Sequence, residues 1–144
     1  MSGDAGVITV AVDGSESSAK ALRWAAEEAR LRHATLRVVH AWMIPALGSA
    51  GTYLPVEVYD QMPKDAAAIL DQQVADVLGE QPDIELERQV VEGLPSNVVL
   101  KAAQGAEMVV VGSRGHGGFT GMLLGSVSTA LVHHAPCPVV VVRS

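Results

Sequence analysis

The sequence contains a single cysteine, Cys137, among its 144 residues, and very few aromatic side chains. A lone cysteine cannot form an internal disulfide, and it has no second cysteine with which to share a zinc ion. No apolar run approaches the length of a membrane-spanning helix, so we expect no association with a membrane. The first residues, MSGDAG, lack the basic and apolar regions of a secretion signal, which favours a cytoplasmic protein.

Positive charge is also scarce, since 10 Lys and Arg residues stand against 16 Asp and Glu residues and give a net charge of −6. No basic stripe with interleaved aromatic residues is present, so we expect no binding to nucleic acid. Alanine and valine are abundant instead. Valine-rich strands that alternate with alanine-rich helices are typical of an α/β sheet covered on both faces. The length suits one domain over residues 1–144.

Apolar periodicity predicts strands that alternate with helices along the whole chain. The predicted strands are Val7–Val12, Thr35–Trp42, Ile84–Glu92, Met108–Val111 and Pro138–Arg143. The predicted helices run from a Ser15 or Ser17 cap to about Arg32, then over Asp65–Leu78, over Ser96–Gln104, and from Ser126 to about His134. The proline-containing stretch Met43–Pro63 is expected to be irregular. Right-handed crossovers between the strands then produce a parallel sheet.

A glycine-rich loop joins the predicted strand Met108–Val111 to the helix that begins near Ser126. Because glycine lacks a Cβ atom, such a loop brings backbone N–H groups close to a ligand, and the N-terminus of the following helix adds more donors. We therefore interpret the loop as a phosphate cradle, with a plain surface loop as the alternative. The G-x4-G-K-[S/T] motif is absent, and the G-x-G-x-x-G frame fails at Thr120.

The spacing of this loop, Gly112-x2-Gly115-x9-Gly125-Ser126, resembles the motif of the universal stress protein family in its ATP-binding branch. A second match lies at the end of the first strand, where that family carries an Asp-Gly-Ser turn and this chain has Val12-Asp13-Gly14-Ser15. The resemblance covers nearly the whole chain. It implies a single-domain, Rossmann-like three-layer sandwich whose five parallel strands have the order 3-2-1-4-5.

The same resemblance implies where a nucleotide binds. Adenine would lie against Ala11, Val12 and Ala41, and Asp13 would reach the ribose or a phosphate-bound Mg²⁺. The phosphates would be held by backbone N–H groups around Gly112, Ser113, Arg114, Gly115, Gly125, Ser126 and Val127.

Side-chain chemistry adds two candidates in the loop. The guanidinium of Arg114 suits a phosphate because it donates bidentate hydrogen bonds, and His116 could contact the ribose or the phosphates. Each candidate has a structural alternative. Asp13 could be a turn or cap residue, Arg114 and His116 could be solvated loop residues, and Ser126 could cap its own helix.

The sequence supports three functional hypotheses that involve a nucleotide, and a ligand-free interaction protein is a fourth. The leading one is an ATP-binding stress or signalling module that binds nucleotide with Mg²⁺ and acts through unidentified protein partners. The second is a slow ATPase or self-phosphorylating enzyme, and the third is a cyclic AMP-binding protein.

No serine lies in a G-x-S-x-G motif, which would place a nucleophilic serine on a strand-to-helix turn. We treat His33 and His40 as structural.

The last predicted strand suggests self-association. Residues 139–142 are all valine, and the resemblance puts this strand at an edge of the sheet. An apolar edge strand invites pairing with another chain. We therefore expect a homodimer that pairs through strand 138–143.

Overall fold

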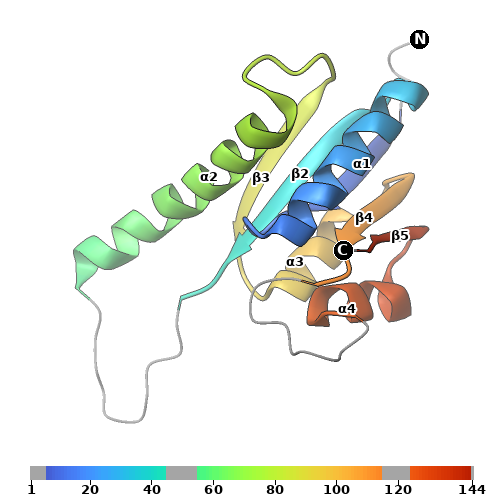
Figure 1. The fold of residues 1–144 in the computed structure, drawn as a ribbon. Helices are drawn as coiled ribbons and strands as arrows, with labels where there is room; N and C mark the ends of the chain where they lie inside the picture. Colours follow the sequence, from blue (N-terminus) through green and yellow to red (C-terminus); the bar gives the residue numbers. More distant parts are fainter. Residues whose placement is uncertain (1–5, 45–54, 115–123, 144) are drawn as a thin grey trace.

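The computed structural model describes residues 6–44, 55–114 and 124–143, which form a parallel sheet with helices on both faces (Figure 1). The strands are β1 (Val7–Ala11), β2 (Thr35–Trp42), β3 (Leu86–Glu92), β4 (Met108–Gly112) and β5 (Val139–Val142). The helices are α1 (Glu16–Arg32), α2 (Val56–Leu78), α3 (Pro95–Ala102) and α4 (Ser126–His134). The strand order is β3-β2-β1-β4-β5, which confirms the predicted fold class.

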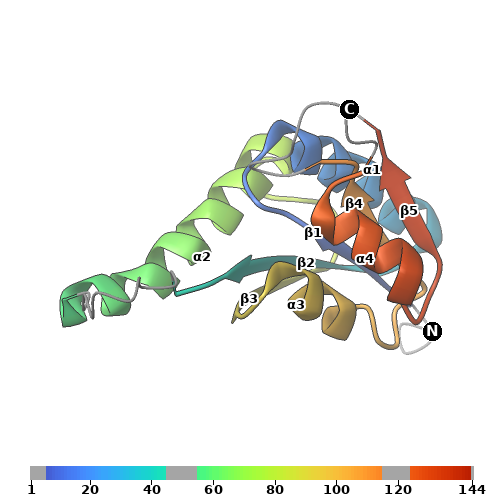
Figure 2. The same cartoon turned by 90° about the horizontal axis from the view of Figure 1, so that it is seen from below.

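Each face of the sheet carries its own apolar cluster, because successive side chains of a strand point to opposite faces. Val10 and Val110 belong to a cluster with Leu22 of α1 and Leu70 of α2. Val109, one residue along β4, belongs to a second cluster beneath α3 and α4. Figure 2 shows α1 and α2 on one side of the sheet and α3 and α4 on the other. Strand β4, an interior strand of the sheet, is therefore buried along its entire length.

Helix α1 begins where the sequence predicts. Ser15 is its N-cap and accepts a hydrogen bond from the Ser18 N–H, which satisfies one of the free donors of the first turn. The buried stripe of α1 is mostly alanine between Leu22 and Ala29. Small side chains let the helix axis approach the sheet closely, and α1 packs against both β1 and β4. The first turn of α1 is thereby fixed beside the ends of these two strands.

Helix α2 differs from its prediction, since it begins at Val56 rather than at Asp65 and continues through Pro63. A proline inside a helix removes one backbone hydrogen bond, which is why an irregular stretch was expected. Pro63 is exposed, so water can satisfy the carbonyl that loses its partner. Tyr59 and Met62 are less exposed than most of their neighbours and continue the buried face of the helix at helical spacing.

The other boundaries differ from prediction by a few residues. Strand β1 ends at Ala11, strand β3 starts at Leu86, and α3 starts at Pro95 with the proline in its first turn. Such shifts are usual at the ends of elements, where hydrogen bonding frays. Within the described ranges, no helix combines the length and the apolar character that crossing a membrane requires.

Candidate functional site

The candidate site lies where β1 and β4 end side by side. These strands are direct neighbours in the sheet, and Val10 is paired with Val110. The turn that follows β1 and the loop that follows β4 therefore leave the sheet at the same edge, the one formed by the carboxyl ends of the strands. Strand order changes direction between these two strands, and such a switch point is where parallel sheets bind ligands. The sequence expectation that Asp13 and the start of the glycine loop share one edge agrees with this arrangement.

Two contacts with β2 hold the chain at the end of β1. The Val12 N–H donates to the Val39 carbonyl over 2.9 Å. Nδ1 of the buried His40 lies 2.9 Å from the Val12 carbonyl, and because a carbonyl can only accept, Nδ1 carries the proton. The sequence predicted a structural role for His40 but no partner for its ring. The structure gives it one, and that partner is the residue directly before Asp13.

Two hydrogen bonds with neighbouring residues hold the turn after Val12. The Asp13 N–H donates to the Ser18 hydroxyl over 3.2 Å, and the Ser15 N–H donates to Asp13 Oδ1 over 2.9 Å. Gly14 between them has a φ of 84°, a left-handed conformation that favours glycine. Asp13 therefore does organise its own turn, as the structural alternative proposed. That role uses Oδ1 to accept one N–H and is compatible with a ligand contact by the same carboxylate.

Gly112 has a packing role that the sequence did not reveal. It is buried at the end of β4, directly against the first turn of α1. A Cβ atom at this position would lie 2.7 Å from the Ser17 carbonyl oxygen and 2.9 Å from its carbonyl carbon, closer than real Cβ atoms come. The first glycine of the motif is thus needed for contact between the helix and the strand. The structure gives no separate reason at Gly112 for a ligand to approach.

Several backbone donors that we predicted to hold phosphates already have protein partners. The Ser113 N–H donates to the Val142 carbonyl over 2.9 Å, which extends the pairing of β4 with β5. The Arg114 N–H donates to the Ser17 hydroxyl over 3.3 Å, and the Gly125 N–H donates to the Ser113 carbonyl over 2.6 Å. These contacts tie both ends of the glycine loop to the body of the fold.

The first turn of α4 offers different donors. Its N-cap is Gly125, which has extended backbone angles and no side-chain capping bond. The alternative role of Ser126 as a cap is therefore wrong, because Ser126 is the first helical residue and lies exposed. The N–H groups of Ser126 and Val127 belong to the first turn, where a helix has no internal acceptors for them. They are thus suited to an anion, which also benefits from the helix dipole.

The remaining predicted site residues are distributed around the same edge. Ala11 and Ala41 are half-buried near the ends of β1 and β2, and Val12 is buried. Arg114 is exposed at the start of the loop. Gly115 and His116 lie outside the described residues. Within the described ranges, no three His, Cys, Asp or Glu side chains gather to hold a metal ion by themselves.

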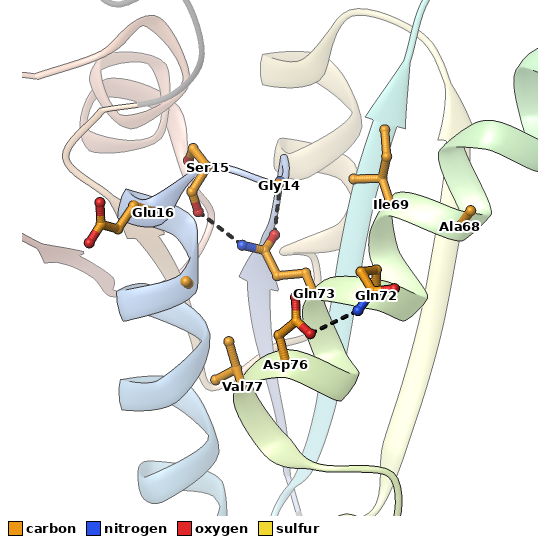
Figure 3. Close-up of a pocket in the computed structure, with 10 residues that line it drawn as sticks. Gly14, Ser15, Glu16, Ala68, Ile69, Gln72, Gln73, Asp76 and Val77 are labelled. Carbon is orange, nitrogen blue, oxygen red and sulfur yellow. Dashed lines mark hydrogen bonds between the residues drawn. The ribbon is translucent and has the colours of Figure 1, made fainter.

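Sequence reasoning missed Gln73 altogether. This buried side chain of α2 reaches across to the turn after β1, as Figure 3 shows. Its Oε1 accepts from the Gly14 N–H over 2.8 Å, and its Nε2 donates to the Ser15 carbonyl over 2.9 Å. The two segments are far apart in the sequence, and a glutamine within a helical pattern carries no local signal of such a contact.

A hollow of about 610 Å³ opens beside this contact, between the first turn of α1 and the middle of α2. Glu16 and Asp76 line it with Ile69, Gln72 and Val77 (Figure 3). Its lining is mixed in polarity and carries carboxylates, which disfavour phosphates. The hollow borders the turn after β1, since Gly14 and Ser15 also line it, but we do not assign the phosphates to it.

Cys137 is half-buried before β5, and burial raises the pKa of its thiol. The neutral thiol therefore predominates at neutral pH, so the side chain behaves as a small apolar group. It packs with Val139 and Leu131 beneath α4. This agrees with a structural role.

Comparison with known proteins identifies the family. A model of the universal stress protein family matches residues 6–143, which is nearly the whole chain. The chain belongs to the universal stress protein family. A universal stress protein from Mycolicibacterium smegmatis is 36% identical over 140 residues, covering 94% of this chain and 45% of the relative. Universal stress protein Rv2005c from Mycobacterium tuberculosis is 38% identical over 136 residues, covering 94% and 45%. This universal stress protein chain thus spans about half the length of these relatives.

Solved structures of universal stress proteins share the fold. The protein UspA from Lactobacillus plantarum has a TM-score of 0.71 at 24% identity, with 96% of this chain and 97% of that chain covered. A universal stress protein in complex with cAMP has a TM-score of 0.58 at 25% identity, with 95% of each chain covered. The Archaeoglobus fulgidus protein in complex with dAMP has a TM-score of 0.55 at 26% identity, covering 94% and 96%. Adenine nucleotides therefore occur in structures of this family.

Proposed function

We propose that this universal stress protein binds ATP with Mg²⁺ at the edge formed by β1 and β4, and acts in the cytoplasm as a stress or signalling module. The observation that carries the proposal is the first turn of α4, whose N-cap, Gly125, has no side chain to satisfy the N–H groups of Ser126 and Val127. Two relatives of known structure were solved with adenine nucleotides, which supports the same ligand class here. The Gly112-x2-Gly115-x9-Gly125-Ser126 spacing supports it from the sequence.

Each part of the nucleotide has a matching group in this proposal. The phosphates lie at the N-terminus of α4, where the helix dipole and the N–H groups of Ser126 and Val127 favour negative charge. Exposed Arg114 adds a bidentate donor to them. Adenine lies between the ends of β1 and β2, against the half-buried Ala11 and Ala41.

Mg²⁺ fits the carboxylate of Asp13, because this ion prefers oxygen ligands and usually binds through one or two carboxylates together with nucleotide phosphates. Asp13 is held in place by the Ser15 N–H, which donates to its Oδ1 over 2.9 Å. When bound, the ion would neutralise phosphate charge. The residues of this chain would hold, orient and partly desolvate the nucleotide.

The test removes one backbone donor without unfolding the helix. Proline is favoured at the first position of a helix, and the extended backbone of Gly125 suits a following proline. Ser126→Pro should therefore keep α4 and lose one N–H group. We expect its affinity for Mg-ATP in calorimetry to fall on the order of tenfold, because a hydrogen bond to a charged group contributes about 1.5–3 kcal/mol.

The matched control is Ser126→Ala, which removes the hydroxyl and keeps the N–H. Its affinity should stay within about twofold of the unsubstituted protein. If the unsubstituted protein binds no Mg-ATP, the proposed function is wrong. If Ser126→Pro binds as tightly as Ser126→Ala, the phosphates do not lie at this helix.

Cyclic AMP is the second candidate ligand, because one related structure holds it. A cyclic phosphodiester carries one charge and needs fewer donors than a triphosphate does. Competition between ATP and cyclic AMP in the same calorimeter separates the two. Slow ATP hydrolysis is a further alternative, and phosphate release faster than about one per second would favour an enzyme.

We also propose a homodimer through β5. This strand is an edge of the sheet, and its four valines are only half-buried. The carbonyls of Pro138 and Val142 accept from β4. Because backbone groups alternate in direction along a strand, those of Val139 and Val141 point away from β4. They can pair with a second copy of this strand.

A further inference from the structure

Gln73 links α2 to the turn that carries Asp13. Its side chain is only 7% exposed, which is unusual for glutamine. Oε1 accepts from the Gly14 N–H over 2.8 Å and lies 3.1 Å from the Ser18 hydroxyl, while Nε2 donates to the Ser15 carbonyl over 2.9 Å. Figure 3 shows the amide pointing from α2 into the turn. One side chain thus satisfies polar groups of three residues.

The chemistry of these contacts matches an amide. The turn presents a donor at the Gly14 N–H and an acceptor at the Ser15 carbonyl, and a carboxamide has both complementary groups in one plane. A carboxylate could accept but not donate, and an apolar side chain could do neither. Buried polar groups that lose their partners are costly, so the turn would shift to find others.

Movement of the turn would change the direction of the Asp13 carboxylate. The Ser15 N–H donates to Asp13 Oδ1, and the Ser15 carbonyl is held by Gln73. Gly14 between them has a left-handed backbone, a region that a glycine leaves easily when nothing restrains it. The contact from α2 therefore restrains the residue whose carboxylate we assign to the nucleotide-bound metal.

We propose that Gln73 is a positioning residue for the nucleotide site, and that it couples nucleotide binding to α2. This inference rests on the proposed function, because the site it serves is the one assigned there. Gln73 does not touch the nucleotide in this proposal. It fixes the turn in the conformation that binds Mg²⁺ and nucleotide. Other conformations of the turn, which would lower the observed affinity, are then rarely populated.

The first experiment compares two neighbouring glutamines of α2. Gln73→Met keeps the length of the side chain and removes its hydrogen bonds to the turn. Gln72→Met is the control, because Gln72 hydrogen-bonds only to Asp76 of the same helix among the contacts that the structure gives for it. We expect Gln73→Met to weaken Mg-ATP binding on the order of tenfold, and Gln72→Met to leave it within about twofold. Equal affinities for the two variants would overturn the proposal.

A purely structural role for Gln73 would lower the melting temperature without changing the affinity of the folded protein. Affinities are therefore measured well below the melting temperature of each variant. A second variant, Gln73→Glu, keeps the acceptors and loses the donor to the Ser15 carbonyl at neutral pH. Burial raises the pKa of a carboxyl group, so acidification should protonate it and restore the donor.

The predicted signature is a change with pH in the ratio of two affinities. The defect of Gln73→Glu relative to the unsubstituted protein should shrink between about pH 8 and about pH 5.5. Protonation of ATP affects both proteins equally and cancels in the ratio. A ratio that does not change with pH would contradict the requirement for a donor at the Ser15 carbonyl.

A measurement without ligand separates this inference from the proposed function. In the free protein, the Gly14 N–H should exchange with solvent more slowly in the unsubstituted protein and in Gln72→Met than in Gln73→Met. If that difference is found but no nucleotide binds, the proposed function is wrong and the turn contact stands as structure only. If nucleotide binds and the difference is absent, the positioning role of Gln73 is wrong.

Discussion

Replacing Gly112 by alanine tests whether contact between α1 and β4 sets the geometry of the candidate site. The new Cβ atom would lie 2.7 Å from the carbonyl oxygen of Ser17, whereas ordinary contact begins at 3.4 Å. The Ser17 side chain could rotate away, but the backbone of α1 could not. The first turn of the helix would therefore have to move by several tenths of an ångström while the buried stripe that ends at Ala29 holds the rest of α1 against the sheet.

The expected cost is that of overpacking a well-packed core, about 1–3 kcal/mol. For a protein of 144 residues, this corresponds to a fall in melting temperature of about 3 to 10 °C. The Ser17 hydroxyl also accepts from the Arg114 N–H, so the start of the glycine loop would move with α1. We therefore expect Gly112→Ala to weaken Mg-ATP binding as well.

Thermal unfolding followed by circular dichroism at a fixed protein concentration measures the first effect, and calorimetry measures the second. Gly105→Ala is the control. It adds the same methyl group where no atom beyond the adjoining residues lies within 4 Å, at a φ of 78°, so it introduces only backbone strain of about 1–2 kcal/mol, far from the site. It should leave nucleotide affinity unchanged. Melting of Gly112→Ala at the same temperature as the unsubstituted protein would refute the packing argument.

Two further predictions concern the edge strand and a surface ion pair. Val141→Pro removes an N–H that points away from β4, so light scattering should detect a monomer. The control Val140→Thr keeps every backbone donor and should remain a dimer. A dimeric Val141→Pro would exclude pairing through β5. Hydrogen bonding from Arg30 lowers the pKa of Asp83 below its usual value. This pair therefore stabilises the fold above the unfolded pKa of Asp83, about 3.9, and the difference in melting temperature from Asp83→Asn should vanish as pH falls through the lower folded pKa. A difference that persists in strong acid would mean that Asp83 acts in another way.

The sequence predicted those features that depend on local patterns. The full extent of β2 and the start of α4 at Ser126 agree with prediction, because apolar periodicity and the glycine spacing are visible within short windows. The strand order agrees with what the resemblance to the family implied. The start of α2 was predicted too late, because Pro63 was taken to end regular structure. An exposed turn tolerates the lost hydrogen bond, and this exposure is a tertiary property.

The candidate site was predictable in its location but not in its internal contacts. The Asp-Gly-Ser turn and the glycine loop can be recognised from their residue types. The contacts that hold them come from distant segments, namely His40 of β2, Ser17 of α1 and Gln73 of α2. None of these residues belongs to a spacing motif, because the role of each depends on a contact with another segment of the fold. The packing role of Gly112 was hidden for the same reason.

Helix α2 is longer than the sheet it covers. Its 23 residues extend about 34 Å at 1.5 Å per residue, whereas the 7 residues of β3 extend only about 23 Å. The turns before Pro63 thus extend beyond β3 (Figure 1), whereas Gln73 is buried in the part of the helix that packs against the rest of the fold. A partner that binds the first turns of α2 would therefore act on the same helix that holds the turn beside Asp13 through Gln73.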